Sequence, residues 1–298
     1  MATNIDLHIH STRSDGTLSP KEILRKAKNY GVGILSICDH DSVGAYTKEF
    51  FNEANSLGIK IICGVEMSTR YFDSGFHILG YNMNIENKEF LGTLKLLQNA
   101  RINYVYDVEK ALNKIGYILH PDEIIHSPSV GKPHVTRNVL SNPQNYTKLI
   151  EDFGHIPSVG EFIETLLNEG CPAYVEKFSI SPMNAAEIIR KAGGKVVLAH
   201  PVAYIYQDGV TREQISELVS LIQPDGIEAY YLFTDTKKGI INETDYWVEF
   251  AKQRNLLCTI GSDYHTSSER MVEIGFYNTD YKIPETDLSK ILETLNIN

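Results

Sequence analysis

The fold can be worked out from the stretch Ile5-Asp6-Leu7-His8-Ile9-His10-Ser11-Thr12-Arg13-Ser14-Asp15-Gly16, where a short apolar run ends in two histidines. Side chains two positions apart on a strand point the same way, so His8 and His10 can contact one ion. Asp15 follows on a turn marked by Gly16. The stretch therefore predicts a strand that ends in a metal site.

The same arrangement recurs along the chain, because other apolar, strand-like runs also end in a histidine or a carboxylate. The residues that follow these runs are His40, Glu66, His200, Asp263 and His265. Each predicted strand therefore delivers a donor, and the donors are expected to form one cluster.

Short β-type runs alternate with amphipathic helical patterns. The predicted strands are residues 5–8, 33–38, 59–65, 77–81, 195–199, 226–229 and 256–260. The helices predicted at 19–30 and 181–192 both begin with Ser-Pro, a cap followed by a first-turn proline. Such alternation is typical of parallel strands with helices outside them, and seven strands favour a barrel over an open sheet.

The alternation breaks between residues 85 and 174, where only helical patterns are found. A long helix is predicted at 90–115 and shorter ones at 132–140, 146–154 and 159–168. We interpret residues 85–174 as a helical insertion that caps the active site. The barrel domain is then discontinuous, comprising residues 1–84 and 175–298, and it closes with a helix at 288–295.

Composition limits the function classes. The 298 residues are 42% hydrophobic and 22% charged, as in soluble globular proteins. The formal net charge of −10 argues against binding of long nucleic acid, which requires an excess of Lys and Arg. No apolar run reaches membrane-spanning length and no signal-peptide pattern is found, so a cytoplasmic protein without a membrane partner is expected. The four cysteines are widely separated, which favours reduced thiols.

Five motifs follow one another in the chain: H-x-H-S-x-x-S-D-G-T-L-S-P from His8, D-H-D from Asp39, G-V-E from Gly64, A-H-P from Ala199 and G-S-D-x-H from Gly261. In this order they resemble the PHP family, named for polymerase and histidinol phosphatase domains. They closely resemble its branch of stand-alone nucleotide phosphoesterases, to which the 3′,5′-nucleoside bisphosphate phosphatases and the 5′-to-3′ exoribonuclease RNase AM belong. The resemblance covers residues 5–79, 131–134 and 173–275.

The resemblance implies a distorted seven-stranded (β/α)7 PHP barrel that carries a trinuclear metal centre. The matching ligand positions are His8, His10, Asp15, His40, Glu66, His77, His200, Asp263 and His265. It assigns His8, His10, Glu66 and Asp263 to one ion. A second ion would bind Glu66, His77 and His200, and a third Asp15, His40 and His265. Two to three divalent ions are expected, with manganese favoured over zinc or iron. Asp39 and Asp41 are interpreted as outer-shell or capping groups.

Four further residues are interpreted as substrate-binding. Gly131-Lys132-Pro133-His134 resembles a G-R-P-H stretch of the branch and predicts a phosphate site at a helix start, although a first-turn proline needs no chemistry. Lys177 resembles a basic position of the family, and Arg13 lies beside the metal loop. Tyr230 and Tyr231 stand where the branch usually has a Tyr-His-Pro-like stretch, and they either stack on a base or pack at the barrel rim.

The chemistry expected of such a centre is phosphoester hydrolysis by metal-bound hydroxide, without a phosphoenzyme. His134, or alternatively Asp263 or His265, is expected to assist proton transfer. The leading hypothesis is removal of the 3′-phosphate from a nucleoside 3′,5′-bisphosphate such as pAp. The second is a 5′-to-3′ exoribonuclease on short 5′-phosphorylated RNA, or a phosphodiesterase on a cyclic sugar phosphate. The third is a metal-bound accessory domain without catalysis.

Overall fold

The computed structural model of the chain describes residues 4–127, 129–235, 238–267, 272–275 and 283–297. Strands and helices alternate over much of this length, and the fold is of the α/β class. The chain forms two compact units, one of Met1–Leu94 with Ile180–Asn298 and the other of Lys95–Ser179. The predicted insertion, residues 85–174, overlaps with the second unit.

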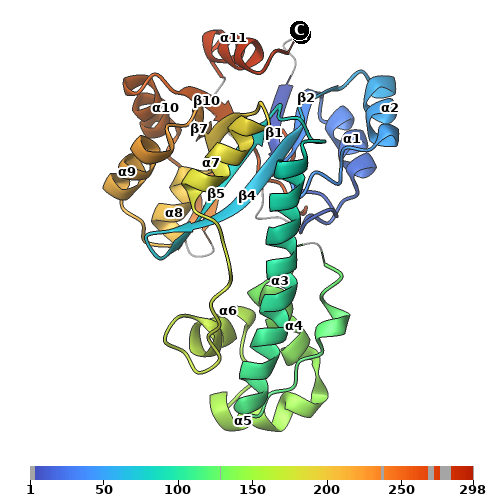
Figure 1. The fold of residues 1–298 in the computed structure, drawn as a ribbon, viewed down its shortest axis with the longest axis vertical. Coiled ribbons are helices and arrows are strands. Elements are labelled where there is room, and N and C mark those ends of the chain that lie inside the picture. The colour runs from blue at the N-terminus through green and yellow to red at the C-terminus, as the bar shows by residue number, and fades with distance from the viewer. Residues whose placement is uncertain (1–3, 128, 236–237, 268–271, 276–282, 298) are drawn as a thin grey trace. The chain divides into compact units, whose positions relative to one another are not determined.

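A three-stranded parallel sheet forms the N-terminal part of the first unit. It consists of β1 (Asn4–Ile9), β2 (Val32–Ile37) and β3 (Lys60–Ile61), and the connections contain α1 (Pro20–Asn29) and α2 (Lys48–Leu57). Ser19 caps α1 in a reciprocal arrangement with Glu22, as the Ser-Pro signal predicts. Figure 1 shows α1 and α2 beside β1 and β2, and their apolar faces share one buried core with these strands.

A five-stranded sheet forms the rest of this unit, in the order β10-β7-β6-β5-β4. Its strands are β4 (Gly64–Tyr71), β5 (Ser74–Tyr81), β6 (Lys195–Leu198), β7 (Gly226–Tyr230) and β10 (Leu257–Ile260). The helices of this part are α7 (Pro182–Lys191), α8 (Pro201–Gln207), α9 (Arg212–Ile222) and α10 (Thr244–Gln253). Figure 1 shows α9 and α10 on the side of the strands opposite to α1 and α2.

The prediction of purely parallel strands is wrong, because β5 runs antiparallel to both of its neighbours, β4 and β6. The two residues that join β4 to β5, Phe72 and Asp73, both have positive φ angles, of 49° and 59°. Two-residue hairpin turns favour this backbone, but their usual sequence signal is Asn-Gly or Asp-Gly. Phe-Asp carries no such signal, so the reversal was not visible in the sequence.

The predicted strand 59–65 is also wrong as a single element, because the chain changes sheets within it. Its first part, β3, pairs with β2, whereas β4 pairs with β5. A continuous apolar run cannot reveal such a change of partner. Gly64 lies at the change, where a Cβ atom would be 2.1 Å from Ser36 Oγ and 2.6 Å from Cys38 Sγ.

The two sheets are joined at both edges by isolated bridges, Ile9 to Tyr264 and His40 to Glu66. At the first edge the His10 amide donates to the Tyr264 carbonyl (2.9 Å), and at the second the Asp41 amide donates to the Glu66 carbonyl (2.9 Å). No continuous ladder joins the two sheets in the described part of the chain, so closure into a seven-stranded barrel stays a prediction.

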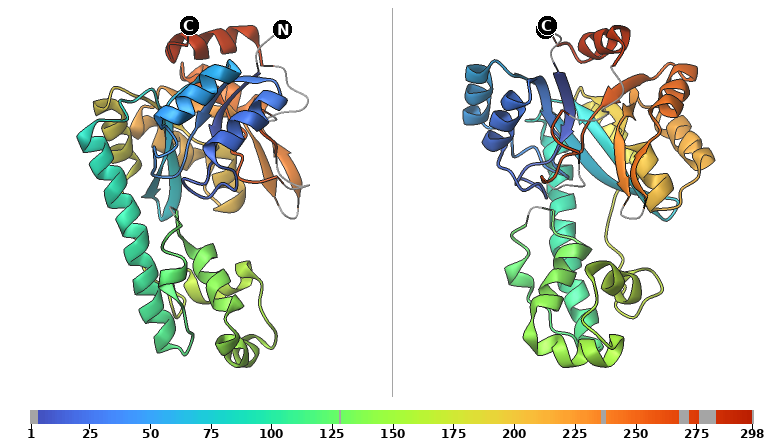
Figure 2. Two further views of the ribbon diagram at one scale, coloured as in Figure 1. Left: turned by 90° about the vertical axis from the view of Figure 1, so that its right-hand side faces the viewer. Right: turned by 180° about the vertical axis from the view of Figure 1, so that it is seen from behind.

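A further pair of strands and the C-terminal helix also belong to the first unit. Strands β8 (Leu232–Asp235) and β9 (Gly239–Asn242) form a separate antiparallel pair directly after β7, and the sequence did not predict it. The C-terminal helix α11 (Glu285–Thr294) begins before the predicted start at 288. In both views of Figure 2 it lies over one end of the strands.

The second unit is helical. Helix α3 (Lys88–Lys114) leads into it, followed by η1 (Pro121–Glu123), α4 (Lys132–Ser141), η2 (Pro143–Asn145), α5 (Tyr146–Phe153), α6 (Val159–Phe162) and the π-turn η3 (Ile163–Leu167). The predicted helices 132–140 and 146–154 match α4 and α5, while the one at 159–168 is split between α6 and η3. A separate buried core, with Tyr104, Leu112 and Phe162 among its members, holds these helices together.

Two expectations from composition can be compared with the structure. All four cysteines, Cys38, Cys63, Cys171 and Cys258, are free thiols. Among the described helices, none combines the length and the apolar character that crossing a membrane requires.

Candidate metal centre

Glu66 lies at the centre of a cluster of histidines. It is 1% exposed and sits inside β4, not after a strand as the sequence suggested. Its Oε2 atom lies 3.5 Å from His8 Nε2, 3.2 Å from His10 Nε2 and 2.9 Å from His40 Nδ1. Its Oε1 atom lies 3.0 Å from both His77 Nδ1 and His200 Nε2. The two carboxylate oxygens therefore serve two separate groups of ring nitrogens.

His8 shows that this cluster is built for a cation. Its Nδ1 faces both carboxylate oxygens of Glu228 (3.1 and 3.2 Å), which can only accept when ionised, so Nδ1 carries the ring proton. In the neutral ring, Nε2 then presents a lone pair to Asp263 Oδ1 (3.4 Å) and to Glu66. It also faces His10 Nε2 at 3.1 Å. Lone pairs that face carboxylates at these distances require a positive charge between them, which either a ring proton or a bound cation supplies.

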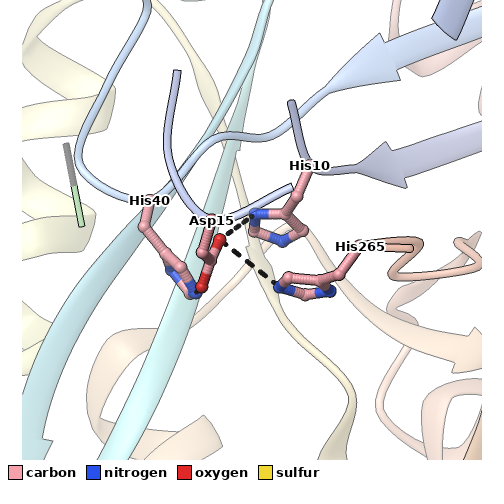
Figure 3. A group of neighbouring side chains, drawn as sticks. All are labelled: His10, Asp15, His40 and His265. Carbon is pink, nitrogen blue, oxygen red and sulfur yellow. Dashed lines mark ion pairs between the residues drawn. The ribbon is translucent and has the colours of Figure 1, made fainter. Parts of the chain in front are cut away.

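A second group of side chains comprises His10, Asp15, His40 and His265 (Figure 3). Asp15 Oδ1 lies 3.4 Å from His10 Nδ1 and 3.5 Å from His265 Nε2, and Asp15 Oδ2 lies 3.6 Å from His40 Nε2. His265 Nδ1 donates to the Asp263 carbonyl (2.8 Å), because a carbonyl can only accept. Its Nε2 therefore presents another lone pair to a carboxylate.

Four buried atoms of the cluster, Glu66 Oε2, Asp15 Oδ1, His40 Nδ1 and His200 Nδ1, have no hydrogen-bond partner in the part of the chain that is described. Buried polar atoms are almost always paired, so this concentration calls for a ligand. Mixed imidazole and carboxylate donors suit divalent transition metals. The residues present therefore fit a metal centre.

Three groups of side chains place their donor atoms close enough to share an ion. One is His8, His10, Glu66 and Asp263, the same four as in the first predicted set. The next, His10, Asp15, His40 and His265, adds His10 to a predicted set. The last, His40, Glu66 and His77, contains His40 where the prediction has His200. Since His200 Nε2 and His77 Nδ1 face the same oxygen of Glu66, His200 also remains a candidate ligand.

The charges of the cluster are strongly coupled. Burial alone would raise the pKa of Glu66, but the charges of His77, His40 and His8 outweigh it and hold the pKa well below its usual range. Burial lowers the pKa of His77 to about 4, against the opposing effect of Glu66. For His8, burial is outweighed by Glu228, Glu66 and Asp263, which raise its pKa well above its usual value. The carboxylates thus stay ionised, and binding of a metal would displace protons.

The backbone is strained at two of the predicted metal ligands. His200 has φ 22° and Asp263 has φ 51°, values that residues other than glycine rarely adopt. His200 directly precedes α8, and its amide donates to Glu228 Oε2 (2.9 Å). The Asp263 amide donates to the His8 carbonyl (2.8 Å). These bonds hold both residues in the conformation that directs their side chains into the cluster.

A cavity of about 480 Å³ adjoins the cluster and is lined by residues of the first unit. Several donors form part of its wall, among them Glu66, His77, His200, Asp263 and His265. Its volume is within the range of small-molecule sites, about 300–1,000 Å³. A small substrate in this cavity would contact the donor cluster directly.

Comparison with known proteins agrees with this geometry. Residues 6–179 match the sequence profile described as PHP domain, which is more than half of the chain. The chain belongs to the PHP domain family.

Two curated relatives align with most of this PHP protein. A 5′-3′ exoribonuclease of Haemophilus influenzae is 28% identical over 267 residues, covering 89% of this chain and 91% of the relative. A 3′,5′-nucleoside bisphosphate phosphatase of Chromobacterium violaceum is 25% identical over 276 residues, covering 91% and 90%. The PHP protein is a metal-dependent hydrolase that acts on phosphoester bonds.

A solved structure supports the fold. An amidohydrolase of Chromobacterium violaceum with bound sulfate superposes with a TM-score of 0.73 at 24% identity. The alignment covers 98% of this chain and 96% of that chain.

The predicted substrate-binding residues lie in different parts of the PHP protein. Arg13 is exposed on the loop between His10 and Asp15. Lys132, His134 and Lys177 belong to the Lys95–Ser179 unit, so their approach to the cluster stays a prediction. Lys132 is the first residue of α4 and donates to Asn168 Oδ1 (2.8 Å), and His134 Nε2 lies 3.4 Å from Ser127 Oγ.

Sequence reasoning missed Glu228 as a site residue, and it named Tyr231 only as a residue that stacks on a base or packs at the barrel rim. Glu228, inside β7, orients His8 and accepts from the His200 amide, and its only signal was a carboxylate within an apolar strand. Tyr231 lines the cavity and donates to Asp263 Oδ2 (3.2 Å). Tyr230 instead donates to Oδ2 of Asp287, a residue of α11 (2.6 Å), and is fully buried, which leaves no face for a base.

Asp39 and Asp41 both accept hydrogen bonds from residues that lie close in the sequence to predicted metal ligands. Asp39 accepts hydrogen bonds from the Ser11 amide (2.7 Å) and the Ser14 hydroxyl (2.6 Å), and Ser14 Oγ lies 3.3 Å from His10 Nδ1. Asp41 accepts from the Ser68 amide (2.8 Å). Neither is part of the candidate metal groups found among the described residues.

Proposed function

We propose that this protein hydrolyses the 3′-phosphoester of a nucleotide that also carries a 5′-phosphate, with a nucleoside 3′,5′-bisphosphate such as pAp as its smallest substrate. The observation that carries the proposal is the division of Glu66 between two groups of histidines directly at the wall of a cavity of small-molecule size. Through these two groups Glu66 would help to hold two cations, which would supply positive charge to a phosphoryl group in the cavity.

The residues that would hold the ions are His8, His10, Glu66 and Asp263 for one, Glu66, His77 and His200 for another, and Asp15, His40 and His265 for a third. We favour manganese for them. When bound, divalent ions there neutralise the phosphoryl oxygens and make a water acidic enough to attack at neutral pH. The proposal includes a distorted seven-stranded barrel made of β1, β2, β4, β5, β6, β7 and β10.

The protein's own groups orient the site and move the proton. Glu228 fixes the tautomer of His8, and Tyr231 fixes the carboxylate of Asp263. Asp263 and His265 line the cavity, so they are placed to pass a proton to the leaving oxygen. We also propose His134 for this role, once the Lys95–Ser179 unit approaches the substrate.

The activities for which the two relatives are named both concern a phosphoester at the 3′-oxygen of a nucleotide. A 3′,5′-bisphosphate carries a phosphate monoester on its 3′-oxygen, and the first internucleotide diester of an RNA includes the 3′-oxygen of its 5′-terminal nucleotide. A single site can serve both if its mouth admits the rest of the chain. The exoribonuclease is therefore kept as a second candidate function, favoured by the 28% identity to the Haemophilus influenzae enzyme.

The test is release of phosphate or mononucleotide from pAp, 3′-AMP, a cyclic sugar phosphate and a short 5′-phosphorylated RNA in the presence of Mn²⁺. We expect pAp to be cleaved with a much higher kcat/KM than 3′-AMP, because the 5′-phosphate supplies binding energy away from the bond that breaks. Equal kcat/KM for the two would contradict the proposal. Far better cleavage of RNA than of pAp would make the second candidate the function.

Lys132 and Lys177 are expected to bind the substrate phosphates. Replacing either with Ala should lower kcat/KM for pAp by about 1.5–3 kcal/mol, the range for hydrogen bonds to charged groups, while metal content stays the same. Lys148→Ala is the matched control, because Lys148 belongs to the same unit and pairs with Asp152 at 2.6 Å. Equal kinetics in all three variants would remove these lysines from the substrate site.

A further inference from the structure

The cavity beside the metal cluster has two chemically different halves. One half consists of the ionisable donors, and the other is built by α8 and the segment that leaves β7. This second wall comprises Ala203, Gln207, Tyr231, Leu232, Phe233 and Thr234. None of the described residues that line the cavity is a lysine or an arginine.

This distribution of charge decides which part of a substrate each half can hold. The donor half, with cations bound, attracts a phosphoryl group. A second phosphate against the other wall would lose water without gaining a positive partner among the residues that line it, which is costly, and the nearby Lys238 Nζ lies over the Tyr206 ring, 5.0 Å from its centroid. The uncharged wall therefore fits an uncharged part of the substrate, and the remote phosphate has to be bound by other residues.

Phe233 gives this wall a flat apolar surface. It lies half-buried in β8, where it pairs with Ile241 of β9. Its ring stacks on Tyr206, with centroids 6.4 Å apart and an interplanar angle of 22°. Tyr206 is itself held by a hydrogen bond from its hydroxyl to Glu243 Oε1 (2.8 Å). The ring is thus fixed before any ligand binds, which lowers the entropy cost of stacking.

We propose that this wall is a nucleobase subsite, in which Phe233 stacks on the base and the exposed Gln207 amide hydrogen-bonds to its edge. The inference rests on the proposed function, since it assigns the base of the same substrate whose 3′-phosphoester is cleaved. An amide offers both donors and an acceptor, so it can recognise the polar edge of a base. Base recognition then depends on β8, an element outside the two main sheets.

The test compares pAp with an abasic analogue, 1,2-dideoxyribose 3,5-bisphosphate, which keeps both phosphates and lacks the base. Phe233→Ala should lower kcat/KM for pAp about 30-fold, the middle of the range for loss of one base–aromatic stack, and leave the abasic analogue unchanged. Phe233→Tyr should retain the wild-type ratio, because it keeps the flat ring. Phe233→Leu should behave as Ala does, although it keeps apolar volume.

Phe51→Ala is the control, because Phe51 is a 37%-exposed phenylalanine on α2 that does not line the cavity. It should leave both substrates unaffected, and metal content should equal wild type in every variant. An equal loss for pAp and the abasic analogue in Phe233→Ala would overturn the base subsite alone. Wild-type enzyme that cleaves neither substrate would overturn the proposed function and, with it, the subsite.

Discussion

The five histidines around Glu66 make this carboxylate the residue on which the whole cluster depends. A glutamine in its place keeps one accepting oxygen but directs an NH2 group at ring nitrogens that need an anion. We therefore expect Glu66→Gln to lose more bound metal and more activity than His77→Ala, which removes one donor at the cavity wall. Elemental analysis after reconstitution measures the first effect. Equal metal content and equal activity in the two variants would show that Glu66 does not bridge.

Tyr231 offers a milder test at the same scale. Tyr231→Phe removes the hydroxyl that holds Asp263 Oδ2 while the ring remains in the wall of the cavity. Loss of such an outer contact typically costs about 10- to 100-fold in metal affinity. A titration with Mn²⁺ should show this weakening. Tyr230→Phe, which removes a hydroxyl bonded to Asp287, is the matched control and should bind metal as the wild type does.

At the scale of elements, the site depends on how closely β10 and the residues after it approach β1 and β7. A Cβ atom on Gly261 would lie 2.2 Å from Glu228 Oε1 and 2.3 Å from His8 Cβ, distances that real side chains do not tolerate. Gly261→Ala should therefore unfold at lower denaturant concentration, by at least about 1–3 kcal/mol for an overpacked core, and bind less metal.

Gly92→Ala is the corresponding control within a helix. Nothing lies within 4 Å of a Cβ atom at Gly92, and the residue is exposed in α3. Alanine should stabilise this helix by up to about 1 kcal/mol and leave metal binding unchanged. If both glycine variants behaved alike in denaturant and in metal content, close packing at Gly261 would not be the cause.

The sequence predicted most elements of the first unit but not all of their partners. Runs such as residues 5–8 and 195–199 carry both an apolar pattern and a terminal histidine, so strand and donor could be predicted together. The direction of β5 could not, because Phe72-Asp73 lacks the usual signal of a tight turn. Strand pairing depends on contacts between residues far apart in the chain, and periodicity reports only on neighbours.

The residues of the candidate site also fall into those that the sequence predicted and those that only their contacts identify. The nine predicted donors all lie in one contiguous cluster, and all of them except His77 belong to one of the five motifs. Glu228 and Tyr231 act through a donor instead of carrying a motif, so only their contacts identify them. Metal binding by the nine stays a prediction, as does the approach of Lys132, His134 and Lys177.

At the scale of the whole molecule, the two units have separate cores, and only one contains the donor cluster. A ligand that binds only the native state stabilises the unit that holds it. Calorimetry of the intact protein should therefore show that a chelator lowers the melting temperature of one transition and leaves a second one, from the helical unit, in place. A single transition that shifts as a whole would show that the two units unfold together.

The helical unit interrupts the sequence of the first unit, so the ribosome makes the predicted metal ligands in two separate groups. Six donors, from His8 to His77, precede the helical segment, whereas His200, Asp263 and His265 follow it. Asp263 and His265 leave the ribosome only after nearly the whole chain has been made, and domains fold as their residues emerge. The nascent chain thus exposes an incomplete set of histidines for most of its translation. A loading step that selects the correct metal has to come at the very end.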